Sequence, residues 1–242
     1  MEQPRPYLSG ENIGDTYLEA LQLLVGRKYM SQHLTLSILQ PLFNTTGQET
    51  PRGLDVDTWS STLNLGSVYQ RFCSFLFSRK TGTGESSGKA WINDRIRALV
   101  DDQGFYHKRL ANQLTMVEKR LNIRNRKGER MHGSSTNALI CQTFQFEDLR
   151  KACKPRPNTG GLPCLVMLDF KPKRDKLNLM AVFRSQFFDT KAYGNLISLA
   201  ILLHQISQKT GYQTGSILST ANNVTFDDRK QIKQLYKHLR TS

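Results

Sequence analysis

The chain has 242 residues and a formal net charge of +14, from 34 lysines and arginines against 20 aspartates and glutamates. A chain of this length can bury its own core, and we expect one domain over residues 1–242. No apolar run approaches the roughly 20 residues that span a bilayer, and the N-terminus lacks a signal-peptide pattern. We therefore expect a cytoplasmic protein without a membrane partner. The charge is compatible with nucleic acid, an acidic protein partner or simply a soluble basic surface.

The cysteines predict neither disulfides nor a structural metal. They are Cys73, Cys141, Cys153 and Cys164. No two of them form a CxxC pair, and no histidines stand at zinc-ligand spacing. We expect four free thiols and no metal.

Hydrophobic periodicity predicts helices and strands in mixed order. Apolar residues at helical spacing predict helices over residues 14–25, 63–77, 90–100 and 106–121, one from near Asp189 and one over 227–239. Alternation and short apolar runs predict strands over residues 33–43, 138–146, 165–170, 177–183 and 216–226, with a helical turn at 147–151. This order indicates an α/β (α+β) domain with a mixed sheet covered by helices.

The Gly- and Ser-rich stretch at residues 79–89 is similar to a phosphate-binding loop but departs from that pattern. Only three residues separate Gly84 from Gly88, and Ala90 follows Lys89 where the Walker pattern needs Ser or Thr. We expect a mobile surface loop here.

Positive charge is concentrated in two groups. The first falls in a basic loop insert at about residues 119–135 and consists of Lys119, Arg120, Arg124, Arg126, Lys127 and Arg130. The second consists of Arg150, Lys151, Lys154 and Arg156. Helix C-termini favour cations, so part of this charge serves capping. Both groups are candidates for binding nucleic acid.

The clearest pattern lies in the stretch from Gly161 to Asn195. A Leu-Pro-Cys corner ending at Cys164 leads to a strand, a charged turn, a second strand ending in Arg184-Ser185, and Asn195 early in a long apolar helix. This order and spacing resemble the thymidylate synthase and pyrimidine nucleotide hydroxymethylase family. The resemblance covers about a third of the chain firmly. It implies a bent mixed sheet covered by helices, and a homodimer.

The resemblance also implies roles for residues. In that family a cysteine thiolate adds to C6 of a pyrimidine nucleotide and activates C5 towards a one-carbon unit carried by tetrahydrofolate. Cys164 would be the nucleophile, Arg184 and Ser185 would bind the phosphate, Asn195 would read the pyrimidine edge, and Tyr106 would keep a family tyrosine. Only a thiolate is an effective nucleophile, and a neighbouring guanidinium favours it.

Several family positions carry other residue types. The proton-relaying glutamate falls on Arg71 or a neighbour, and the aspartate after the Arg-Ser pair is Phe187. The sugar-binding histidine and tyrosine fall on Val224 and Phe226, and the second phosphate-binding arginine pair falls on residues 137–138. Each lost acid-base or oxyanion contact costs roughly two orders of magnitude or more in rate.

Three hypotheses stay open. In the first, which we expect, the protein is a non-catalytic subunit of a larger assembly that binds nucleic acid or a protein partner and needs no cofactor. In the second, it is an enzyme that transfers a methyl or hydroxymethyl group to pyrimidine C5, with tetrahydrofolate as donor. In the third, it is a sensor that binds a pyrimidine nucleotide at Arg184 and Asn195 without turnover.

Overall fold

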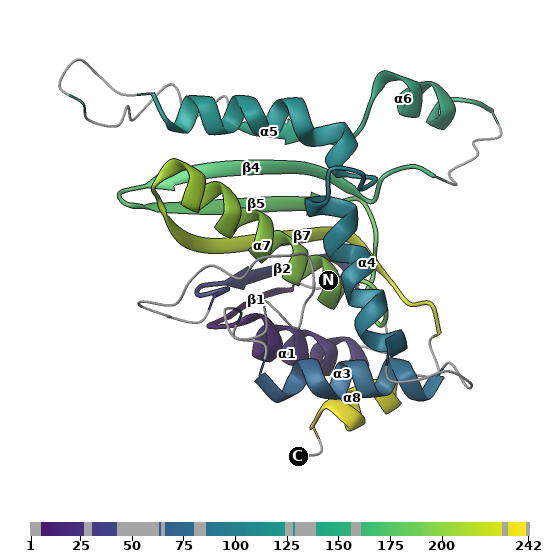
Figure 1. Ribbon diagram of the computed structural model, residues 1–242. Helices are drawn as coiled ribbons and strands as arrows, with labels where there is room; N and C mark the ends of the chain where they lie inside the picture. The colour runs from purple at the N-terminus through teal and green to yellow at the C-terminus, as the bar shows by residue number, and fades with distance from the viewer. Residues whose placement is uncertain are drawn as a thin grey trace.

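The computed structural model describes residues 6–26, 31–42, 63, 66–79, 86–123, 128, 139–155, 161–228 and 232–240. Within these ranges seven strands form one mixed sheet, and seven helices accompany it (Figure 1). This confirms the predicted mixed α/β class. None of the helices in these ranges is long and apolar enough to cross a membrane. The single domain over 1–242 stays a prediction, and most of its basic loop insert lies outside the described residues.

The sheet has the strand order β1-β2-β7-β5-β4-β3, with β6 beside β7. The strands are β1 Tyr7–Gly10, β2 Ser31–Ile38, β3 Ile140–Gln142, β4 Leu165–Lys173, β5 Lys176–Phe183, β6 Gln186–Phe187 and β7 Gln213–Thr225. β4 and β5 form an antiparallel hairpin, whereas β5 and β7 are parallel. A parallel pair needs a crossover connection, and the longest described helix provides it here.

The helices lie on and around this sheet. They are α1 Ile13–Gly26, α3 Gly66–Arg79, α4 Ser86–Val100, α5 His107–Leu121, α6 Phe146–Ala152, α7 Ala192–Thr210 and α8 Ile232–Arg240. α7 crosses the sheet, and α4 packs beside it (Figure 1). α1, α3 and α8 contact one another at one end of the fold.

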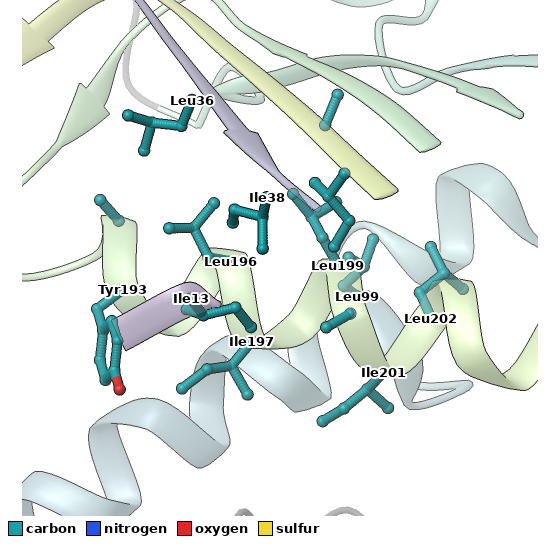
Figure 2. Packing of buried hydrophobic residues seen from close by; sticks show 14 of the residues in the cluster. Ile13, Leu36, Ile38, Leu99, Tyr193, Leu196, Ile197, Leu199, Ile201 and Leu202 are labelled. Carbon is teal, nitrogen blue, oxygen red and sulfur yellow. The ribbon is translucent and has the colours of Figure 1, made fainter. Parts of the chain in front are cut away.

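The core is centred on α7, which is apolar on nearly all sides. In Figure 2, Leu196 and Leu199 lie on the side of the strands with Ile38, while Ile197 and Ile201 point away from them. These five side chains are fully or almost fully buried. A helix that is apolar all round belongs inside the protein, and α7 is therefore the element on which the other layers pack.

The two faces of the sheet differ in burial. Along β5, Leu177, Leu179, Ala181 and Phe183 are buried, whereas Asn178, Met180 and Val182 between them are partly exposed. Successive side chains of a strand point to opposite faces, and α7 contacts both β5 and β7. The buried face of these strands is therefore the one under α7, and the opposite face is partly open.

Several predicted boundaries differ from the structure. The loop expected at 79–89 is shorter, because α4 begins at Ser86; residues 80–85 lie outside the described ranges. Serine and glycine are tolerated in the first helical turn, where the N–H groups have no partner within the helix. β1 was not predicted, and α7 begins at Ala192 rather than near Asp189.

Candidate functional site

The corner that carries Cys164 is tied to the end of β5 by Arg184. The Arg184 backbone N–H donates to the Cys164 carbonyl at 2.9 Å. Its Nε donates to the Pro163 carbonyl at 3.0 Å, and its Nη2 to the Leu162 carbonyl at 3.4 Å. Cys164 is a partly exposed free thiol. Two of the five guanidinium N–H donors therefore hold the corner, and the remaining three could bind a phosphate.

Tyr106 holds the other side of the same corner. It precedes the first turn of α5, and its hydroxyl oxygen accepts the backbone N–H groups of Cys164 at 3.3 Å and Leu165 at 3.4 Å. Burial, followed by the neighbouring Cys164, raises the pKa of Tyr106, while the two backbone hydrogen bonds act in the opposite direction. The phenol is therefore protonated at neutral pH.

A small cavity lies next to Tyr106 and receives Asn195. Its volume is about 10 Å³, and its lining comes from α4, α7 and the adjoining ends of β4 and β5. The lining residues are Arg95, Leu99, Tyr106, Leu165, Phe183, Asn195, Ser198 and Leu199. A cavity of this size has room for about one water molecule. In this conformation it admits neither a pyrimidine nucleotide nor a tetrahydrofolate.

Arg95 is a site residue that the sequence reasoning missed. It belongs to α4, where Ile92, Ile96 and Leu99 are buried, and its own Nε is buried without a hydrogen-bond partner in the described residues. A charged residue inside an otherwise apolar helical stripe is the signal that could have found it. Its stem passes Gly194 of α7, where an added Cβ would lie 2.9 Å from Arg95 Cγ.

The positions at which the resemblance placed other polar groups have packing roles. Phe187 lies on β6, with the Lys191 ammonium 5.0 Å from its ring centroid. Val224 is buried and pairs with Gln186, and Phe226 packs against the core. Ser185 is partly exposed beside Arg184, and Arg71 is partly exposed on α3. Residues 137–138 lie outside the described ranges.

Asp189 is a buried carboxylate near this region that the sequence reasoning also missed. It is 1% exposed and accepts the backbone N–H groups of Asp227 at 3.0 and 3.1 Å and of Asp228 at 3.0 Å. It therefore joins the turn before α7 to the segment after β7. Its carboxylate oxygens thus stabilise this junction of the fold.

The described members of the two basic groups lie apart. Lys119 and Arg120 are in the last turn of α5, whereas Arg150 and Lys151 are in the last turn of α6, followed by exposed Lys154. α6 is ion-paired with the first turn of α5 through Arg109 and Asp148. About ten helical residues, or roughly 15 Å, thus separate Arg109 from Lys119. The group members outside the described residues are Arg124, Arg126, Lys127, Arg130 and Arg156.

Comparison with known proteins gives a distant similarity. No protein-family model matches the chain. A Methanosarcina mazei protein named "Putative thymidylate synthase" is 33% identical over 60 residues, which is 25% of this chain and 28% of that protein. The matched part spans little more than a quarter of the relative's length. This similarity suggests a distant link to thymidylate synthases and extends no further.

Proposed function

We propose that this protein is a divergent thymidylate synthase-like protein that has lost turnover and acts as a nucleic-acid-binding subunit of a larger assembly. The observation that carries the proposal is that packing residues stand where the resemblance places sugar-binding groups: Val224 is buried, and Phe226 packs against the core. In addition, the cavity of about 10 Å³ beside Tyr106 and Asn195 has no space for a pyrimidine ring. The net charge of +14 supports a polyanionic partner.

Binding to DNA and RNA of the same sequence tests this function. We expect the dissociation constant to rise steeply with salt, because each phosphate neutralised by Lys or Arg releases a counterion. Neutralising Lys119 and Arg120 together should lower the slope of log K against log salt by about 2. Fluorescence anisotropy with labelled oligonucleotides measures both quantities.

A matched control is available on α8, where Lys233 and Arg240 are exposed and distant from α5. The double variant Lys233→Gln/Arg240→Gln removes the same charge and should keep the wild-type slope. If the wild-type protein binds no nucleic acid, or binds it independently of salt, the partner is a protein instead. Co-purification from the native source would then identify the other members of the assembly.

A second candidate function is supported by the arrangement around Cys164. The partly exposed free thiol of Cys164 lies at the corner that Arg184 and Tyr106 hold by hydrogen bonds. Asn195 lines the neighbouring cavity. Opening of this cavity would let the thiolate add to C6 of a pyrimidine nucleotide. The present cavity does not fit tetrahydrofolate, so we assign no step to that donor.

The two candidates differ in covalent chemistry. An enzyme that forms the Cys164 adduct should gain the mass of one 5-fluoropyrimidine nucleotide in intact mass spectrometry, and Cys164→Ala should abolish the gain. Cys153→Ala, which removes an exposed free thiol elsewhere, should leave it unchanged. We expect no adduct with the wild-type protein. Calorimetric binding of a nucleotide without an adduct would instead support the sensor, with Asn195→Ala as the variant that weakens it.

A further inference from the structure

The hairpin between β4 and β5 gathers positive charge outside both basic groups. Lys173 pairs with Lys176 across the hairpin, and Arg174 and Asp175 form the turn between them. All four side chains are exposed. Together with Asn178 they line a surface hollow of about 350 Å³. Three cations and one carboxylate thus surround a hollow in the size range of small-ligand sites.

Two features of this hairpin oppose its own stability. Arg174 has φ of 58°, in the left-handed region that glycine adopts freely and that a side chain disfavours. Lys173 and Lys176 stand directly opposite each other, and like charges in a cross-strand pair repel. Glycine at 174 and a carboxylate at 173 or 176 would suit the fold better. The positive φ of Arg174 and the paired lysines bring no gain in stability, which indicates that the charges serve a function.

The base of the hairpin is hydrogen-bonded to β7, which positions the backbone that carries the three cations. Asn178 Oδ1 accepts the backbone N–H and the hydroxyl of Ser216, both at 2.9 Å, and its Nδ2 donates to the Lys171 carbonyl at 3.2 Å. The Gln213 N–H donates to the Asp175 carbonyl at 2.8 Å. β7 approaches so closely that a Cβ on Gly215 would lie 2.4 Å from Asn178 Oδ1.

The same end of the molecule carries the C-termini of α5 and α7 (Figure 1). Lys209 of α7 is paired with Glu118 of α5 at 2.9 Å, and Lys171 with Asp169 at 3.0 Å. Gln213, soon after α7, is in register with Lys176. Among the described residues, the hairpin and the last turn of α5 also carry Lys119, Lys173, Arg174 and Lys176 against Asp175. This end therefore has a clear positive excess.

We infer that the hairpin tip is a nucleic-acid contact surface at which Lys173, Arg174 and Lys176 bind backbone phosphates. The inference rests on the proposed nucleic-acid-binding function and adds to it a surface that neither basic group contains. Contacts to phosphates position the chain without reading sequence. The surface should therefore accept DNA and RNA backbones alike, because both present the same phosphodiester charge.

The test is the triple variant Lys173→Gln/Arg174→Gly/Lys176→Gln, measured by anisotropy on duplex DNA, single-stranded DNA and RNA. Loss of three phosphate contacts should lower the salt slope by about 2.7 on duplex DNA and about 2.1 on single strands. When the salt rises from about 50 to 200 mM, the variant should therefore lose less affinity than wild type. The difference is a factor of about 40 on duplex DNA and about 20 on single strands. The matched control Lys233→Gln/Lys237→Gln/Arg240→Gln on α8 should keep the wild-type slope.

The single variant Arg174→Gly separates binding from folding. It removes the guanidinium and also the unfavourable φ, so it should weaken nucleic-acid binding while keeping or raising the melting temperature. If the triple variant keeps the wild-type slope while Lys119→Gln/Arg120→Gln lowers it, the hairpin inference is wrong and the proposed function stands. If the wild-type protein shows no salt-dependent binding to any of the three nucleic acids, the proposed function fails and the inference fails with it.

Discussion

Asp148 on α6 is a buried charge with several protein partners. It is 3% exposed, forms a buried ion pair with Arg109, and accepts the backbone N–H of Gln145 at 3.0 Å. Arg109 also donates to the Thr143 carbonyl at 3.0 Å and lies 4.7 Å from the Phe105 ring centroid. One carboxylate thus joins α6 to the first turn of α5, next to the Tyr106 contact with Cys164.

This arrangement predicts a pH-dependent contribution of Asp148 to stability. The Arg109 hydrogen bond holds the pKa of Asp148 below its ordinary value. A carboxyl whose folded pKa is depressed stabilises the protein fully above its unfolded pKa of about 3.9, and the contribution is lost as the pH falls through the folded pKa. Asp148→Asn should therefore cost on the order of 1 to 3 kcal/mol at pH 7, measured by urea unfolding.

The gap between wild type and Asp148→Asn should shrink as the pH falls below about 4. Glu147→Gln is a suitable control, because Glu147 is an exposed neighbour on α6 whose ion pair with Arg150 spans 3.4 Å. Exposed pairs of this kind contribute little, so this variant should stay close to wild type throughout. A gap for Asp148→Asn that is the same at pH 7 and pH 3 would contradict the prediction.

Single residues of the site could be predicted where they lie close in sequence or in a resembling motif. The spacing placed Cys164 and Arg184 at the two ends of one hairpin, and the structure joins them through the Arg184 backbone N–H. Arg95 could not be placed in this way. Its position beside Asn195 depends on how α4 packs against α7, and hydrophobic periodicity does not determine that packing.

Elements with a strong internal pattern were predicted well. The apolar run of α7 and the amphipathic stripe of α5 were both identified, and α5 ends at Leu121 as expected. β1 was missed because its four residues alternate between exposed and partly exposed, so they carry no buried-face signal. What makes this segment a strand is its parallel pairing with β2, which is a tertiary contact.

Element ends were set by contacts distant in sequence. The late start of α7 leaves Asp189 in a turn, where its carboxylate accepts the amides of Asp227 and Asp228. Thr225 and Asp228 have the sequence spacing of a helix capping box, but Thr225 is in β7 and its hydroxyl donates to the Gln186 carbonyl at 3.3 Å. Sequence patterns identify the capping residues but not their partners.

At the scale of the whole molecule, the partly open sheet face is a surface on which two copies could meet. At its centre, two rows of side chains cross β5 and β7: Met180 pairs with Leu218, and Val182 pairs with Thr220. The Thr220 hydroxyl lies 3.2 Å from the hydroxyl of Thr35 on β2. A chain with a charge of +14 repels its own copies, so self-association requires a surface of low net charge. These rows are neutral, and on the adjacent strand the Lys171 charge is balanced by Asp169. We therefore propose this face as the interface of the expected homodimer.

This proposal predicts the oligomeric state of two glutamate variants. A stable dimer buries about 800 Å² per partner with a neutral, well-packed centre, and an unpaired carboxylate there is costly. Wild type should therefore elute with the mass of two chains in size-exclusion chromatography with light scattering, and Leu218→Glu should elute as a monomer. Phe146→Glu is the control, since Phe146 is 73% exposed on α6, outside the sheet, and should leave the dimer intact. A wild-type monomer at micromolar concentration, or a dimer broken by Phe146→Glu and not by Leu218→Glu, would rule out this interface.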